Sequence, residues 1–245
     1  PFDRGRLDES ERPFTEGVPG DIRVATRFDP ADPFIGLLGA LHETGQALYD
    51  LGVPAEWRDQ PVGRDRGLAL EQGLSLLLEM QLGRSPAFVS CVRPLVEKHL
   101  GVSGPAWTDE NIYRRLLRVR RSLVRVDADE LTYPVHIMVR YDIERRLLSG
   151  RLRVADLAEA WNEAMEARLG CRPAGDVEGV LQDMQWAVGS FGCFPAYLLG
   201  SAIAAQLWES LREDCPGLDE AIRRGDFTGL VSWLRDNVHA HGASM

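Results

Sequence analysis

The sequence predicts a mainly α-helical protein with a small β-sheet, folded as one domain over residues 1–245. Apolar residues recur every three or four positions along most of the chain, and Gly, Pro or Ser stands where these stretches begin or end. One region near the N-terminus instead alternates apolar with polar residues, which is typical of a strand. The 245 residues are 44% hydrophobic and 27% charged, enough for a sizeable core.

The small sheet is expected from two short segments. Residues 1–20 are rich in Pro, Gly and charge, and we expect an extended lead-in there. The first strand is expected from Asp21 to Phe28, where apolar and polar residues alternate, and Pro33 then begins a helix. A second short strand is expected at residues 123–126.

Most of the remaining chain is expected to be helical. The first helix, from Phe34 to Leu51, follows from its apolar spacing and ends before Gly52 and Pro54. Ser85 followed by Pro86 is typical of a helix start. Further helices are expected at residues 67–83, 85–99, 108–117, 129–148, 154–169, 177–188, 194–211 and 227–238, with a short one near Leu218.

Charge and composition narrow the class of protein. The formal net charge is -9, which argues against a nucleic-acid surface as the main function. The basic run between Arg114 and Arg121 is interpreted as a solvated helix face. No apolar run is long enough to span a membrane, and we expect no membrane association. The four cysteines are scattered and form no C-x-x-C pair, which favours reduced thiols in a cytoplasmic protein.

One stretch of the first predicted helix carries chemistry. His42-Glu43-Thr44-Gly45-Gln46 differs by one residue from the H-E-x-x-H motif. In that motif two histidines one helical turn apart bind zinc, and the Glu polarises a metal-bound water. Gln46 stands where the second histidine would be, so Glu43 is the candidate catalytic base of an incomplete metal motif.

The motif does not stand alone, and the series to which it belongs resembles a known family. The matching segments, with the pattern each approaches, are Arg12–Thr15 (H-P-F), Asp21–Ala25 (D-x-R-x-T), His42–Gln46 (H-E-x-x-H), Glu71–Gly73 (H-E-S), Val124–Asp129 (I-R-x-x-A-D) and Gly179–Trp186 (G-x-x-Q-D-x-H-W). In this order they resemble the Taq carboxypeptidase family of zinc metallocarboxypeptidases. The resemblance covers nearly the whole chain.

The resemblance implies a fold and an activity. It implies a zinc-peptidase-like helical fold with a small sheet beside the cleft, equivalent to the C-terminal catalytic half of a family member, with the N-terminal half absent. It also implies that zinc-bound water, activated by Glu43, releases C-terminal residues from peptides. A lone histidine on a helix is more often structural, but within this series His42 is expected to line the active-site cleft.

The departures from the family pattern fall on its chemistry. The resemblance places the three metal ligands at His42, Gln46 and Gln72, which offer one imidazole and two neutral amide oxygens. We judge this set too weak for stable zinc binding. Glu71 or Glu79 could substitute, but Glu71 is about 100° around the helix from position 72 and is expected to be solvated. Motif histidines are also replaced at Arg12, Glu71 and Gln185.

Four residues are assigned to substrate binding. Arg125 could hold a terminal carboxylate through its guanidinium fork, or it could form an ion pair with Asp127 or Asp129. The hydroxyl of Tyr197 could support an oxyanion. The substrate-binding candidates are Arg125, Tyr197, Gln182 and Asp183.

Together these observations predict a metallocarboxypeptidase-like protein without a cofactor, which has lost zinc binding and catalysis and serves as a peptide-binding or regulatory module. The alternative is an active carboxypeptidase that uses zinc or another divalent metal. In either case the expected partner is a peptide C-terminus or a protein. The cleft that a missing half would leave open is expected to be covered in a homodimer or a complex.

Overall fold

The computed structural model describes residues 4–18, 20–58 and 60–244, and these group into two compact units. The first unit comprises residues 1–116 and 199–245, and the second comprises residues 117–198. Both are mainly helical, and the first also contains a small sheet, which confirms the predicted fold class. The assignment of residues 1–245 to one domain stays a prediction.

The sheet of the first unit has three strands, β1 (Gly5–Glu9), β2 (Phe14–Val18) and β3 (Asp21–Thr26), in the order β1-β3-β2. β1 is parallel to β3, and β2 is antiparallel to it. β3 confirms the strand expected from alternation. β1 and β2 lie in the segment expected to be an extended lead-in, and β2 buries only Thr15, so neither edge strand carries an alternating apolar pattern.

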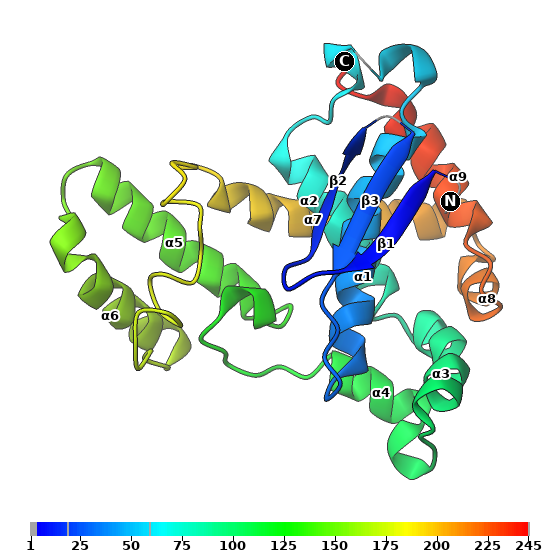
Figure 1. Cartoon of the computed structure of the whole chain (residues 1–245), viewed down its shortest axis with the longest axis horizontal. Coiled ribbons are helices and arrows are strands. Elements are labelled where there is room, and N and C mark those ends of the chain that lie inside the picture. Colours follow the sequence, from blue (N-terminus) through cyan, green and yellow to red (C-terminus); the bar gives the residue numbers. More distant parts are fainter. Residues whose placement is uncertain (1–3, 19, 59, 245) are drawn as a thin grey trace. The chain divides into compact units, whose positions relative to one another are not determined.

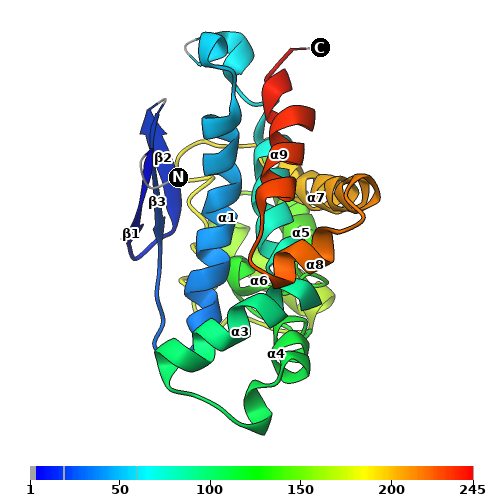
Figure 2. The ribbon, with the colours of Figure 1, turned by 90° about the vertical axis from the view of Figure 1, so that its right-hand side faces the viewer.

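Helix α1 (Pro33–Gly52) lies against this sheet, as Figure 2 shows. It begins where expected, because the Asp32 side chain accepts a hydrogen bond from the Phe34 amide and Pro33 occupies the first turn. Thr26 of β3 donates its hydroxyl to the carbonyl of Gly36 at 3.1 Å, which ties the last residue of the sheet to the helix. The helix therefore presents one side to the strands and the other to α2.

The predicted helix at residues 67–83 is continuous but changes type. α2 (Leu68–Leu76) passes directly into η3, a π-helical stretch at Leu77–Leu82. α1 and α2 pack closely at Gly45, where a Cβ atom would collide with the carbonyl oxygen of Leu74. π-helical turns are often found at functional sites, and this one carries Glu79.

The other helices of the first unit match the sequence prediction within a few residues. α3 (Pro86–Leu100) starts with the Ser85 hydroxyl accepting from the Phe88 amide at 3.2 Å and ends at Gly101 with φ 65°. The remaining helices are α4 (Asp109–Leu116), α8 (Leu218–Arg223), α9 (Thr228–Asn237) and the part of α7 (Phe194–Asp214) that follows residue 198, with short 3-10 turns at Ala55–Trp57, Pro61–Gly63, Pro105–Trp107 and His239–His241. Leucines of α2 and η3 form the centre of the core.

The second unit is built around α5 (Tyr133–Leu148) and α6 (Leu157–Leu169), which pack side by side in Figure 1. Trp161 and Met165 of the predicted α6 stripe are almost fully buried against Val139 and Ile143 of α5. Gly170 ends α6 in the left-handed conformation at φ 65°, as its position predicted. Short 3-10 turns precede both helices, at Arg125–Asp127 and Val154–Asp156.

Two predictions in the second unit were wrong. The strand expected at residues 123–126 is an irregular segment ending in a 3-10 turn. The helix expected at residues 177–188 is a series of turns, in which the Leu181 amide bonds to the carbonyl of Asp176 and that of Val188 to Met184. Both segments are irregular for the same physical reason. The side chain of Gln182 forms hydrogen bonds with the backbone of each segment, in place of the regular bonds of a strand or a helix.

No helix in the described part of the chain is both long enough and apolar enough to cross a membrane.

Candidate functional site

His42, the first residue of the incomplete metal motif, lies on α1 and contacts a carboxylate from η3. Its Nδ1 atom is 2.9 Å from Oε2 of Glu79, and the second oxygen of Glu79 accepts from Arg84 at 3.1 Å. Burial alone would raise the pKa of Glu79, but His42 and Arg84 hold it below its ordinary value. Metal-binding histidines usually have such a carboxylate on the ring nitrogen that does not touch the metal. Glu79 thus occupies an orienting position on His42.

Glu43, the candidate catalytic base, is tied to the sheet. It is buried, with 9% of its surface exposed, and the hydroxyl of Thr15 is 2.7 Å from its Oε2 atom. The same hydroxyl is 2.8 Å from the carbonyl oxygen of Glu43, so β2 contacts both the side chain and the backbone of this residue. The carboxylate of the motif is therefore retained in a defined position. Sequence reasoning did not identify Thr15 as its partner.

Gln46 and Gln72 lie on the two helices predicted for them. Gln46 is on α1, one turn after His42, and Gln72 is on α2; both side chains are half-buried. The Cβ of Gln72 packs against α7, where a Cβ at Gly200 would lie 2.8 Å from it. His42 and Gln46 therefore lie on one helix and Gln72 on the adjacent one, as expected, while their assignment as ligand positions stays a prediction.

The donor set at these positions does not fit zinc. His42 contributes one imidazole, and Gln46 and Gln72 contribute amides, which carry no charge and bind zinc far more weakly than imidazole or carboxylate. In residues 4–18, 20–58 and 60–244, no group of three or more His, Cys, Asp or Glu side chains is arranged to hold a metal ion.

Glu71 differs from its sequence expectation. It was expected to be a solvated charge that points elsewhere, but its side chain is half-buried. Burial raises the pKa of Glu71, the charges of Asp65, Asp50 and Glu43 raise it further, and only His42 opposes them. Its carboxylate is therefore electrostatically coupled to the motif on α1. Glu71 is about 100° around the helix from position 72, but this separation does not turn it away from the charged residues of α1.

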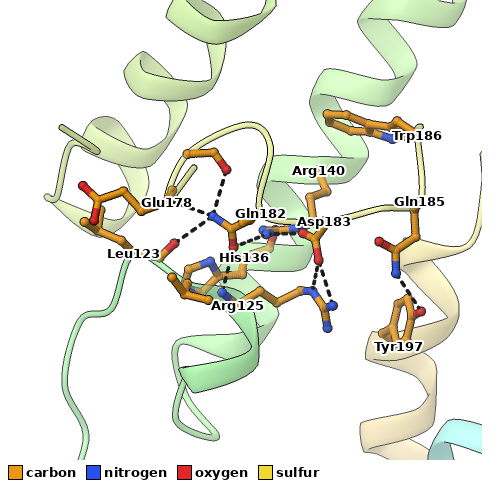
Figure 3. A network of polar contacts seen from close by, with 12 residues as sticks. Leu123, Arg125, His136, Arg140, Glu178, Gln182, Asp183, Gln185, Trp186 and Tyr197 are labelled. Carbon is orange, nitrogen blue, oxygen red and sulfur yellow. Dashed lines mark hydrogen bonds and ion pairs between the residues drawn. The ribbon is translucent and has the colours of Figure 1, made fainter. Parts of the chain in front are cut away.

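The second unit holds the four substrate-binding candidates, and Figure 3 shows three of them, Arg125, Gln182 and Asp183, joined in one polar network, with Tyr197 bonded to Gln185 beside it. Asp183 receives Nε and an Nη of Arg125 on one oxygen, at 3.1 and 2.8 Å. Its other oxygen receives Nε of Arg140 at 2.5 Å. Gln182 accepts from the Arg125 amide at 2.8 Å and from Arg140 at 2.7 Å, and its own amide donates to backbone carbonyls including that of Leu123.

Arg125 forms an ion pair with Asp183. The partners expected from the sequence were Asp127 and Asp129, and that expectation was wrong. Asp129 instead accepts from the backbone amides of Arg120, Leu131 and Thr132, which fixes the turn before α5. The Asp183 carboxylate is buried, which would raise its pKa, but the two guanidinium groups outweigh burial and lower it.

Arg140 is the residue of this network that sequence reasoning missed. Its side chain is fully buried on α5, and its guanidinium lies 4.7 Å from the centre of the Trp161 ring and 5.6 Å from that of Phe194. Burial lowers the pKa of Arg140 to about 10 despite the opposing charge of Asp183. The signal in the sequence is an arginine within the apolar stripe of a helix, which requires a buried partner.

Tyr197 joins the same network at the start of α7. Its ring lies below the Arg125 guanidinium at 5.2 Å, and its hydroxyl accepts from the side-chain amide of Gln185 at 3.2 Å. Gln185 stands at the histidine position of its motif. The four candidates from the second unit are thus brought together, whereas the metal motif forms its own cluster in the first unit.

Comparisons with known proteins agree with these motifs. Residues 1–245 match the family described as carboxypeptidase Taq (M32) metallopeptidase. The chain is 37% identical over 242 residues to carboxypeptidase 1 of Bacillus subtilis (strain 168), a match that covers 98% of this chain and 48% of that protein. It is 36% identical over 242 residues to thermostable carboxypeptidase 1 of Pyrococcus furiosus, again over 98% of this chain and 48% of the relative.

Solved structures give the same result. Metallocarboxypeptidase 1 of Trypanosoma cruzi matches with a TM-score of 0.93 at 40% identity, over 100% of this chain and 50% of that one. The M32 carboxypeptidase of Deinococcus radiodurans R1 matches with a TM-score of 0.91 at 39% identity, over 99% of this chain and 49% of that one. The chain spans about half the length of the relatives that it matches.

Proposed function

The chain belongs to the carboxypeptidase Taq (M32) metallopeptidase family, and from that premise we propose that it retains the family fold without zinc binding or peptide hydrolysis. Its function in this proposal is that of a non-catalytic module that binds a peptide C-terminus or a protein partner.

The observation that carries the proposal is the donor set at the three ligand positions. A set of two histidines and one glutamate provides two imidazoles and one negative charge to a divalent cation. His42, Gln46 and Gln72 provide one imidazole and no charge. The loss of two strong donors from a three-ligand site removes the basis of stable zinc binding.

The catalytic step depends on that loss. Glu43 is kept and held by Thr15, but a carboxylate acts as a base on water at neutral pH only if the water is acidified. Bound zinc would supply this acidification and polarise the peptide carbonyl. Without it, Glu43 is a buried carboxylate that joins α1 to β2, which is a structural role.

Peptide binding rests on the network of the second unit. Arg125 keeps 11% of its side chain exposed, and its guanidinium is held in place by Asp183 and by the ring of Tyr197. A pre-oriented guanidinium can share its remaining donors with a carboxylate at little entropic cost. This supports recognition of a peptide C-terminus that does not lead to cleavage.

One observation favours the alternative, an active metal-dependent carboxypeptidase. Glu79 contacts Nδ1 of His42 as an orienting carboxylate does in a working metal site. In this alternative zinc or another divalent metal would be held by His42 together with a donor beyond the three positions considered. The two functions differ in bound metal and in chelator-sensitive cleavage.

The proposed setting is a homodimer or a complex in the cytoplasm. Support for a partner comes from residues 177–191 of the second unit, where several apolar side chains are more than half exposed, including Val177, Leu181 and Val188. The four cysteines are all free thiols, which fits a reducing compartment. Light scattering across a concentration series would test the oligomer, and a monomer at every concentration would contradict it.

The test of the function compares three proteins: wild type, the double change Gln46→His with Gln72→Glu, and a control with Gln206→His and Gln60→Glu at exposed positions. Each is incubated with zinc, desalted, and assayed for bound metal and for release of C-terminal residues from a peptide. We expect zinc in the double variant alone and no cleavage by the wild type. Cleavage by the wild type that a chelator abolishes would establish the alternative.

A further inference from the structure

A cleft between α5 and α6 in the second unit is lined by four arginines. Its volume is about 380 Å³, and its lining residues are Asp142, Ile143, Arg145, Arg146, Arg151, Ala164 and Arg168. None of these residues belongs to the motif clusters described above. We propose that this cleft binds a small phosphate-bearing anion.

The charge of the cleft is not balanced by protein groups. Asp142 forms an ion pair with Arg168, which accounts for one of the four guanidinium groups. Within the described residues, Arg145, Arg146 and Arg151 have no carboxylate partner. Arg145 lies over the Tyr141 ring at 5.5 Å, and Arg151 donates to the Ser149 hydroxyl at 2.9 Å, contacts that leave their charges unneutralised.

Nearby arginines outside the cleft are arranged differently. Arg153 forms an ion pair with Asp156 at 2.7 Å, and Arg172 pairs with both Glu159 and Glu166. These two exposed arginines of the second unit thus have carboxylate partners, unlike the three in the cleft. Three unpaired positive charges around one cleft, in a chain with a net charge of -9, form a local site for an anion.

Helix electrostatics explains only part of the cluster. Arg145 and Arg146 are in the last turn of α5, where a cation is favoured by the helix dipole. Arg151 follows the helix, and Arg168 comes from the last turn of α6, so two separate elements converge on the cleft. Like charges brought together repel each other, and a bound anion offsets that repulsion.

The geometry favours phosphate over a single carboxylate. A carboxylate satisfies one guanidinium fork, whereas a phosphate group offers up to two negative charges and three acceptor oxygens. The volume is at the lower end of small-molecule sites, which span roughly 300–1,000 Å³. Ala164 adds apolar surface beside the charges, which suits a phosphate attached to an organic group. The negative net charge disfavours a nucleic-acid strand.

The test titrates the full chain with inorganic pyrophosphate, ATP, citrate and a short single-stranded oligonucleotide by calorimetry. The pocket variant carries Arg146→Gln and Arg151→Gln. The matched control carries Arg153→Gln and Arg172→Gln, which removes the same charge from the same unit outside the cleft. Circular dichroism confirms that both variants are folded, and a variant that fails to fold is replaced by the single change Arg146→Gln.

We expect pyrophosphate and ATP to saturate one site with a Kd below about 1 mM, to bind more weakly as salt is added, and to lose at least tenfold affinity in the pocket variant alone. Citrate should bind more weakly than pyrophosphate. Equal affinity in the pocket and control variants, no saturable heat with either phosphate compound, tighter binding of citrate, or binding of the oligonucleotide alone would overturn the proposal. Because no metal ligand is altered, these results are independent of zinc binding.

Discussion

Replacing Asp183 by Asn should destabilise the second unit by about 3 kcal/mol. The carboxylate faces two buried guanidinium groups, with Arg140 fully buried and Arg125 only 11% exposed. Removing one partner of a buried ion pair costs roughly 3–5 kcal/mol, because the other charge is left uncompensated. The Asn oxygen can still accept from one guanidinium, so we expect a value near the lower end of that range.

The control is Asp156→Asn, which breaks the exposed pair with Arg153. There the two side chains are 49% and 79% exposed, and pairs of this kind contribute between about 0 and 1 kcal/mol. Both variants lose one negative charge and keep their side-chain shape, so they differ mainly in burial. A large difference between the two variants in the loss of unfolding free energy would therefore come from the burial of the charges.

The assay is urea unfolding followed by tryptophan fluorescence. Trp161 lies against Arg140 and reports on the second unit, while hydrogen exchange of α5 and α6 amides separates this unit from the first if the unfolding is not two-state. The reasoning would be refuted by a loss below about 1 kcal/mol for Asp183→Asn, or by equal losses in the two variants.

Three further changes test other parts of the structure. Thr15→Val should cost about 2 kcal/mol in urea unfolding, because it leaves the buried carboxylate of Glu43 without its hydroxyl donor, whereas Thr15→Ser should cost much less. Burial lowers the pKa of His239 to about 4. As the pH falls, this histidine therefore takes up a proton in the unfolded chain before it does so in the folded protein. The contribution of His239 to stability is then complete above about pH 6.5, and up to about 3 kcal/mol of it is lost as the pH drops towards 4. His239→Phe should remove this contribution and leave that of His136, whose pKa burial also lowers to about 4; an unchanged slope would contradict the assignment. Gly45→Ala should cost about 1–3 kcal/mol by forcing α1 from α2, while Gly229→Ala, where a Cβ meets open space, should be neutral; equal melting temperatures would show that the helices are not in close contact.

The helices were predictable because their signals are local. The start of α1 is encoded by Asp32 and Pro33, and the start of α3 by Ser85 and Pro86. β1 and β2 were not predicted, because an edge strand that buries little more than Thr15 has no reason to alternate. The sheet exists because β3 and α1 provide the surface on which these strands pair.

The segment at residues 177–188 shows how a tertiary contact overrides a local pattern. Its apolar spacing suits a helix, yet Val177, Leu181 and Val188 are exposed in turns. Gln182 and Asp183 bond instead to residues more than forty positions earlier in the chain. Those bonds satisfy buried charge, which outweighs the modest helical preference of an exposed segment.

The contrast between local sequence signals and contacts distant in the chain also applies to the candidate site. The motifs singled out His42, Glu43 and Arg125 from the sequence, and their assignment to a functional site stays a prediction. They could not identify Thr15 or Arg140 as partners, and they named Glu79 only as a substitute ligand, because each of these contacts joins segments 28 to 43 positions apart. Spacing within one helix also gave the wrong environment for Glu71, since the charges that act on it come from α1 and from a loop.

The zinc content of the wild-type protein tests the central claim most directly. The chain is dialysed against a slight excess of zinc at neutral pH, washed with metal-free buffer, and analysed for zinc per chain, with Gln46→His/Gln72→Glu as the positive comparison. The weak donor set of His42, Gln46 and Gln72 predicts far less than one zinc per wild-type chain and close to one in the double variant. One tightly held zinc per wild-type chain, lost when His42 is changed to Ala, would contradict the account.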